Sequence, residues 1–283
     1  MGDCCAAAAT SAAARRSSSR RTGEAAFWAI SSLLFAVSAA ATIAWCASMS
    51  ASAMTDMPMP GGWAMSMAWM RMPWQTWLGA AASFLGMWTV MMVAMMLPSL
   101  IPMLRRYRRA VSLARSGATR VGWLTTLVGA GYFFVWTLSG VAAYPMGVAL
   151  AAIEMRKPAI ARAVPLAVGV VVVLAGCLQL TAWKVRHLAC CREAPGRGLT
   201  LPTGAGTAWR HGVRLGLHCS YCCAGLMAIL LVVGVMDLRT MAAVTAAVTV
   251  ERLAPAGERI ARASAAVVIG AGLFLLARAL GLA

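Results

Sequence analysis

Four side chains that can bind soft metal ions lie within six residues of one apolar stretch. They are His218, Cys219, Cys222 and Cys223, in the segment HCSYCCAGLM. If this segment is helical, the three thiols stand at positions i, i+3 and i+4 and share one face. Thiolates and imidazoles bind Cu(I) and Zn(II), and a Cys-x-x-Cys pair can also form a reversible disulfide. The segment therefore predicts a metal site, a redox pair, or small residues that only pack within a helix.

A second group of the same residue types precedes this segment. His187 stands three and four residues before Cys190 and Cys191, so the imidazole and the thiols share a helical face. Both groups border the same basic loop, and we expect them on the same side of the protein, where they can meet. We predict all of these side chains as metal ligands, for copper or alternatively for zinc.

Methionine is concentrated in two places. One is the segment MSASAMTDMPMPGGWAMSMAWMRMPWQTW, which holds Met57 and Met59, and the other is WTVMMVAMMLPSLIPM, which holds Met91 and Met95. Thioethers select Cu(I) over harder ions, so we predict these four methionines as further ligands. The alternative is packing, because methionine fills irregular spaces between helices and, with tryptophan, suits a lipid interface.

The composition excludes a soluble protein. The chain of 283 residues is 61% hydrophobic and 12% charged, and its mean hydropathy is +0.77. A soluble domain carries about 25% charged residues. The net charge of +17 comes from arginines that lie between apolar runs, which is typical of loops held on the cytoplasmic side of a membrane. We therefore expect the lipid bilayer as a partner, possible partner proteins for metal or electrons, and no nucleic acid.

The apolar runs predict an all-α fold, a polytopic transmembrane bundle of six or seven spans, since a span needs about 20 apolar residues. A basic leader, 1–24, is predicted to be disordered and cytoplasmic, and 25–283 to form the helical membrane domain with a Met-rich outer loop at 48–76. The spans are expected at 25–47, 77–104, 122–150, 163–183, 215–236, 238–250 and 260–280. The sixth of these is short, and whether it crosses is left open.

The charged residues between the spans predict the orientation. Arginine and lysine concentrate in alternate loops, although Arg156, Lys157 and Arg162 stand on the predicted outer side. This bias places the N-terminus in the cytoplasm of a multi-pass protein of the bacterial inner membrane. Arg252 counts among these loop charges. Asp237 and Glu251 are expected at the two membrane interfaces, and Lys184 either snorkels or links helices.

Several stretches resemble a known family. These are SFLGMWTVMMVAMMLPSLIPML, GYFFVWTLSGVAAY, AGCLQLTAWKVRHLACCREAP and HGVRLGLHCSYCCAGLMAILLVVGVMDLRTMAAVTAAVTVERLAP. In order and content they resemble the DUF2182 family, described as predicted metal-binding integral membrane proteins of bacteria. The resemblance covers most of the chain from about Met54, and it implies metal binding but no reaction. Its motif positions fall on Gln179, Lys184, Cys191, Cys219, Cys222, Cys223, Asp237 and Glu251.

Two positions depart from the family pattern: Asp237 stands where asparagine is common, and Arg252 where lysine is common. Neither departure removes a soft ligand. His218 is not clearly a feature of the family.

Three functions remain open from the sequence. The leading hypothesis is handling of a soft metal ion, copper first, with the outer methionines collecting the ion and the Cys/His groups binding it. The second is a membrane thiol-disulfide oxidoreductase that uses Cys219 and Cys222. The third is a structural subunit of a membrane complex. No phosphate-binding loop is present, which argues against an ATP-driven pump.

Overall fold

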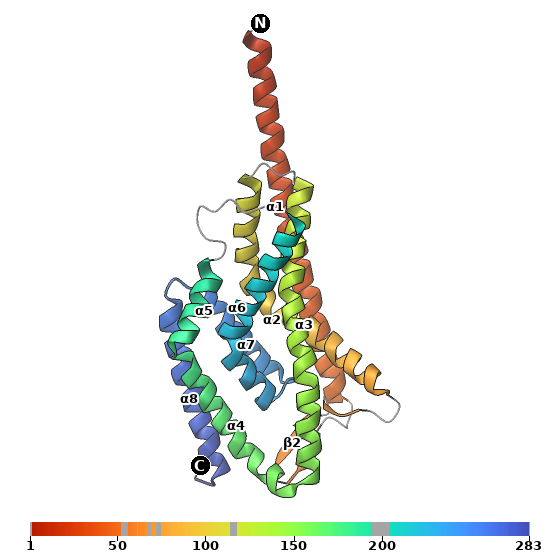
Figure 1. Cartoon of the computed structure of the whole chain (residues 1–283), viewed down its shortest axis with the longest axis vertical. Coiled ribbons are helices and arrows are strands. Elements are labelled where there is room, and N and C mark those ends of the chain that lie inside the picture. Colours follow the sequence, from red (N-terminus) through yellow and green to blue (C-terminus); the bar gives the residue numbers. More distant parts are fainter. Residues whose placement is uncertain are drawn as a thin grey trace.

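The computed structural model describes residues 2–51, 56–60, 62–66, 69–71, 75–113, 118–193 and 204–282. Helices dominate these ranges, which confirms the all-α fold class (Figure 1). The elements are α1 (Gly2–Ala51), β1 (Asp56–Met59), β2 (Trp63–Ser66), α2 (Trp77–Leu113), α3 (Ala118–Arg156), α4 (Pro158–Gln179), α5 (Ala182–Glu193), α6 (Ala205–Val233), α7 (Leu238–Leu253) and α8 (Gly257–Ala279).

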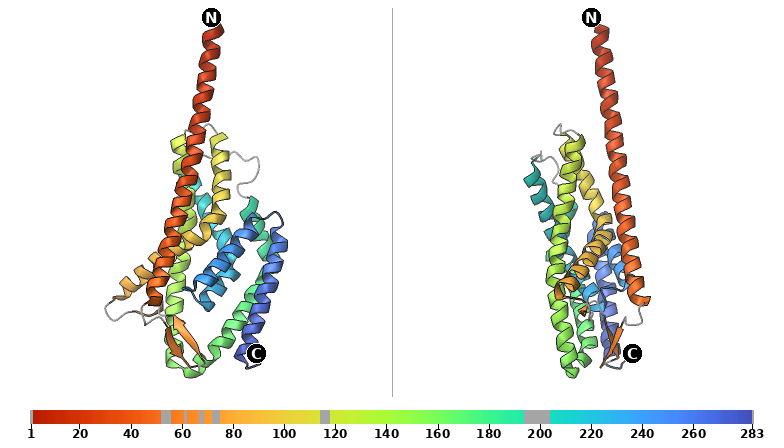
Figure 2. Two further views of the ribbon diagram at one scale, coloured as in Figure 1. Left: turned by 180° about the vertical axis from the view of Figure 1, so that it is seen from behind. Right: turned by 90° about the vertical axis from the view of Figure 1, so that its right-hand side faces the viewer.

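Helix α1 begins at Gly2 and so includes the leader that the composition predicted to be disordered. Alanine is abundant in this leader and has the highest intrinsic helix propensity, which gives a physical reason for helical backbone there. Figure 2 shows the N-terminal part of α1 projecting well beyond the other helices.

Six helices are long and apolar enough to cross a membrane: α1, α2, α3, α4, α6 and α8. The segment predicted as a short sixth span lies in α7, whose 16 residues extend about 24 Å at 1.5 Å per residue. That length is less than the roughly 30 Å of a hydrocarbon core. The two termini lie at opposite ends of the molecule (Figure 1), so α7 carries the chain back along the bundle between α6 and α8.

The predicted outer loop contains a short antiparallel hairpin instead of only irregular chain. Strand β1 pairs with β2, and Met57 stands opposite Met65. The indole nitrogen of Trp63 donates to the carbonyl oxygen of Ala161 over 2.8 Å. This contact attaches the hairpin to the corner between α3 and α4, near the end of the molecule that holds the C-terminus (Figure 1).

Small residues bring the central helices close together. A Cβ atom on Gly131 of α3 would lie 2.7 Å from the carbonyl oxygen of Trp209 on α6, and one on Gly212 would overlap the carbonyl oxygen of Val128. In a membrane, such residues let helix backbones approach and replace the missing hydrophobic driving force. They hold α6, which carries the three cysteines, directly against α3.

We expect Gly212→Ala to destabilise the protein by roughly 1–3 kcal/mol, because the added methyl group would meet backbone that cannot move aside. Gly129→Ala on α3 is the matched control, since its Cβ would meet nothing within 4 Å. That change should be neutral or stabilising by up to about 1 kcal/mol through helix propensity. Thermal unfolding in detergent would measure both, and equal effects would refute close packing at Gly212.

Candidate metal centre

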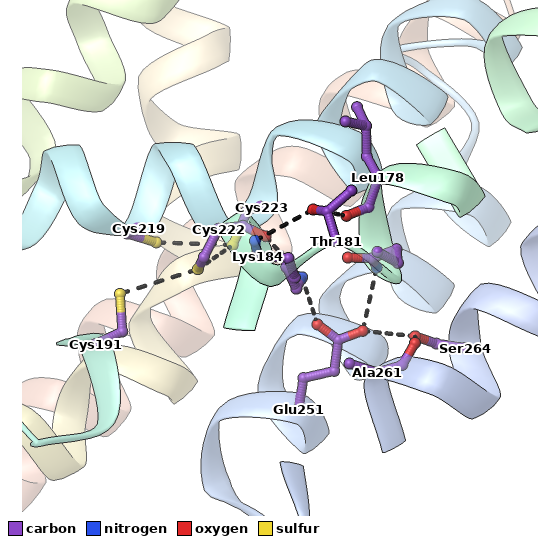
Figure 3. A network of polar contacts seen from close by, with 11 residues as sticks. Leu178, Thr181, Lys184, Cys191, Cys219, Cys222, Cys223, Glu251, Ala261 and Ser264 are labelled. Atoms are coloured by element: carbon purple, nitrogen blue, oxygen red, sulfur yellow. Dashed lines mark hydrogen bonds and ion pairs between the residues drawn. The ribbon is translucent and has the colours of Figure 1, made fainter. Parts of the chain in front are cut away.

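Three thiols of α6 converge inside the bundle. Cys219, Cys222 and Cys223 are at most 2% exposed, and their Sγ atoms all lie within 4.8 Å of one another. The Sγ atoms of Cys222 and Cys223 are 3.5 Å apart, and those of Cys219 and Cys223 are 3.9 Å apart. The helical spacing of the sequence therefore does bring these side chains together, as Figure 3 shows.

A fourth thiol comes from α5. The Sγ atom of Cys191, whose side chain is fully buried, lies 3.9 Å from that of Cys222 (Figure 3). This hydrogen bond with Cys222 lowers the pKa of the Cys191 thiol, although burial opposes the effect. Helix α5 is held in place by Lys184, whose Nζ donates to the carbonyl oxygen of Cys222 over 2.6 Å. Two helices that are separate in sequence thus supply one cluster, Cys191, Cys219, Cys222 and Cys223, which we name the thiol cluster.

A buried guanidinium lies beside the thiol cluster. Arg252 on α7 is only 4% exposed and interacts electrostatically with the thiols of Cys219, Cys191 and Cys222. Its Nη1 lies 3.4 Å from the hydroxyl of Tyr132, which in turn donates to the Sγ atom of Cys219 over 2.9 Å. The sequence-based assignment of Arg252 to a cytoplasmic loop was wrong, because α7 turns this side chain into the core.

Helix α2 supplies the remaining contacts of this guanidinium. The Nη1 atom donates to the hydroxyl of Ser99 over 2.8 Å, and Nη2 lies 3.9 Å from the sulfur of Met103. Helix α2 continues through Pro98 and Pro102 to Leu113, so the prolines do not end it. The uninterrupted helix places Ser99 and Met103 against α7.

A buried ion pair lies on the other side of Cys222. The Nζ of Lys184 is 2.7 Å from the Oε2 of Glu251, and both side chains are at most 3% exposed. The Oε1 of Glu251 accepts from Gln179 at 3.2 Å and from Ser264 at 2.6 Å. The expectation that Glu251 lies at an interface was wrong, and Lys184 links helices instead of snorkelling (Figure 3). Three of the positions that the resemblance identified therefore form one network.

Asp237, the other acidic residue expected at an interface, caps α7. Its carboxylate accepts from the backbone nitrogens of Arg239 and Thr240. Hydrogen bonding by the Thr240 hydroxyl lowers the pKa of this carboxyl. An N-cap of this kind fixes where α7 starts, and hence where Glu251 and Arg252 point.

The rings of the two histidines contact each other, but neither ring is hydrogen-bonded to a thiol of the cluster. The rings of His187 and His218 are 5.6 Å apart between centroids, and Tyr221 and Trp183 flank His187. The Nδ1 of His218 is buried without a partner among the described residues. Burial, and then the neighbouring His218, lower the pKa of His187, which favours the neutral imidazole that metals require.

The remaining predicted ligands lie elsewhere. Cys190 is exposed, although it is adjacent to Cys191. Met59 is buried in a small separate cluster with Met65 and two alanines. The side chain of Met57 lies outside the described residues.

Met91 and Met95 are buried on α2 in the same core as the thiol cluster. Sequence reasoning missed that Met92 and Met96 share a helical face with Ser99 and Met103, at steps of four, three and four residues. These methionines therefore lie on the face of α2 that reaches Arg252. Which face of α2 points toward α7 depends on how α2 is rotated about its axis relative to its partner helices. The sequence pattern does not show this rotation.

The chemistry of this donor set fits Cu(I) well. Soft thiolates with thioethers nearby suit Cu(I), and four thiolates can also form a tetrahedral Zn(II) shell, so the donor set indicates a soft metal ion without excluding zinc. Because the four thiols are close together, an ion bound by some of them can exchange one thiol ligand for another. The reduced thiols are buried, and a fixed positive charge stands beside them.

Residues 85–275 match the family described as PpoB2, copper chaperone. The match covers more than half of the chain and includes the whole thiol cluster, Lys184, Glu251 and Arg252. No curated protein and no solved structure matches the chain. The family match does not name DUF2182, but it supports a copper-related membrane family. On this match, and with a cysteine cluster suited to a soft metal, the chain belongs to the PpoB2 family of copper chaperones.

Proposed function

We propose that this protein is an integral membrane copper chaperone that binds one Cu(I) ion at the thiol cluster and passes it to a partner protein. The observation that carries the proposal is the meeting of Cys191 from α5 with Cys219, Cys222 and Cys223 from α6, inside the bundle. The ion is cargo in this account, not a resident cofactor.

The arrangement suits transfer better than permanent storage. Cu(I) accepts a small number of soft ligands, so a cluster of four thiols has more donors than the ion needs. A thiol of the partner can then replace one thiol of the cluster while others keep the ion bound. Burial of the cluster keeps water and oxidants away from it during the exchange.

The remaining predicted ligands have secondary roles in this proposal. His187 and His218 form a second binding position for the ion beside the cluster. Met91 and Met95 form part of the apolar, sulfur-containing packing around the cluster. Met57 and Met59 of the hairpin collect copper at the end of the molecule that holds the C-terminus (Figure 1). We further propose that the protein lies in the bacterial inner membrane with a cytoplasmic N-terminus, which the alternation of basic loops supports.

A thiol-disulfide oxidoreductase is the second candidate. It is favoured by the Cys219-x-x-Cys222 spacing and by the 3.5 Å separation of the Cys222 and Cys223 sulfurs. A redox partner must reach the sulfur that it attacks, however, and all four thiols of the cluster are at most 2% exposed. Exchange of copper with a partner thiol needs access of the same kind, so the match to a copper chaperone family, and not the burial of the thiols, favours the metal function.

An anaerobic titration would test the function. The protein, reduced and purified in detergent, is titrated with Cu(I) against a chromogenic Cu(I) chelator. We expect one Cu(I) per chain to be taken from the chelator and then released to a peptide that contains two cysteines. A protein that takes no copper from the chelator, but cycles between dithiol and disulfide forms, would support the oxidoreductase instead.

A further inference from the structure

Within the part of the chain that the structure describes, Arg252 is a buried cation without a carboxylate partner. Among the described side chains, the ion pairs are those of Glu24 with Arg105 and Arg109 and that of Glu251 with Lys184. Arg252 instead contacts the neutral groups of Ser99, Tyr132 and Met103. Its Nε has no hydrogen-bond partner among the residues that the structure describes.

This situation is costly in the absence of an anion. A guanidinium stays charged at all accessible pH values, and an unpaired buried charge destabilises a protein strongly. The neighbouring Glu251 does not relieve the cost, since its two oxygens are used by Lys184, Gln179 and Ser264. Among the described groups that interact with Arg252, the thiols are those that lose a proton when copper binds.

We infer that Arg252 is the counter-ion of the copper–thiolate complex and sets its charge. This inference rests on the proposed function. A Cu(I) ion held by two thiolates carries a net charge of −1, because two protons leave and one positive ion enters. One guanidinium neutralises that charge. The Lys184–Glu251 pair is neutral in total and leaves the balance unchanged.

The position of Arg252 on α7 also connects the complex to α3 and α2. Tyr132 of α3 links the guanidinium to Cys219, and Ser99 and Met103 tie it to α2. It is therefore a positioning and affinity-determining residue, not a metal ligand. Charge-assisted interactions with an anion in a low-dielectric interior are much stronger than the same interactions in water.

The test compares Arg252→Gln, Arg252→Lys and the parent. Cu(I) affinity is measured by competition with a chelator, and the stability of the copper-free protein by thermal unfolding. We expect Arg252→Gln to lower the Cu(I) affinity by at least about tenfold, as loss of one member of a buried charge pair does. The melting temperature of the copper-free protein should stay equal or rise, because an unpaired charge is removed. Arg252→Lys should retain most of the affinity.

A second variant keeps the test decisive if Arg252→Gln does not fold. Ser99→Asp places a carboxylate next to the guanidinium and supplies the missing anion permanently. We expect a more stable copper-free protein and a weaker affinity for Cu(I). Arg108→Gln is the control, since Arg108 contacts Phe27 and the carbonyl oxygen of Gly23 instead of the thiols, and it should leave the affinity unchanged.

The outcomes separate the two claims. A parent that binds no Cu(I) overturns the proposed function itself. If the parent binds Cu(I) but Arg252→Gln and Ser99→Asp bind it with the same affinity, only the role of Arg252 is overturned. A lower melting temperature of copper-free Arg252→Gln with unchanged Cu(I) affinity shows a purely structural arginine and also overturns it.

Discussion

Replacement of Cys219, Cys222 and Cys223 by serine is expected to abolish high-affinity Cu(I) binding. Serine keeps the size of the side chain but replaces a soft thiolate by a hydroxyl, which is a poor ligand for Cu(I). The remaining thiol of the cluster, Cys191, cannot hold the ion alone. We expect the affinity to fall by at least about a thousandfold, which corresponds to roughly 4 kcal/mol.

Two cysteines provide matched controls for this variant. Cys190 and Cys177 are exposed, and neither has a sulfur contact with the cluster. Cys190→Ser and Cys177→Ser should bind Cu(I) as the parent does, whereas Cys191→Ser should weaken binding to an intermediate degree. Competition with a Cu(I) chelator under anaerobic conditions measures all four proteins. Unchanged affinity in the triple variant would mean that the copper site lies elsewhere in the chain.

Replacement of Lys184 by methionine is expected to cause the largest loss of stability. The change leaves the carboxylate of Glu251 buried with only Gln179 and Ser264 as partners, and breaking a buried ion pair in this way costs about 3–5 kcal/mol. It also removes the donor to the carbonyl oxygen of Cys222, so Cu(I) affinity should fall as well. Thermal unfolding in detergent and chelator competition provide the two readouts.

The double variant Lys184→Met, Glu251→Leu shows whether the lost stability comes from the unpaired carboxylate of Glu251 or from the loss of the lysine side chain itself. It removes both charges, and we expect it to recover most of the stability that the single variant loses. Glu24→Gln is the control, because the Glu24–Arg105 pair is 54% and 34% exposed and should contribute less than about 1 kcal/mol. A double variant that is less stable than Lys184→Met alone would contradict this account of the pair.

The sequence predicted the features that depend on local periodicity. Apolar runs located the long helices, and the i, i+3, i+4 spacing identified Cys219, Cys222 and Cys223 as one face. Lys184 and Glu251 were singled out as charges near helix ends and as positions of the resemblance, but separate segments carry them and nothing local shows that they pair. The hairpin of β1 and β2 was missed because its methionine, proline and glycine residues do not give a clear alternating pattern.

The sequence pattern could not predict the role of Arg252, for a related reason. Counting arginine and lysine between apolar runs treats every such residue as a solvated loop charge. Helix α7 is too short and too weakly apolar to be recognised reliably as part of the core, so Arg252 was assigned to a loop and Glu251 to a membrane interface. Only the packing of α7 against α2 and α6 shows which way these side chains point.

The most direct test of the central claim is X-ray absorption at the copper edge on the Cu(I)-loaded protein, with the triple cysteine variant alongside. We predict an edge typical of Cu(I) and a first shell of sulfur alone in the parent, and no comparable sulfur shell in the variant. A first shell of nitrogen or oxygen in the parent, or the same sulfur shell in both proteins, would contradict copper binding at the thiol cluster.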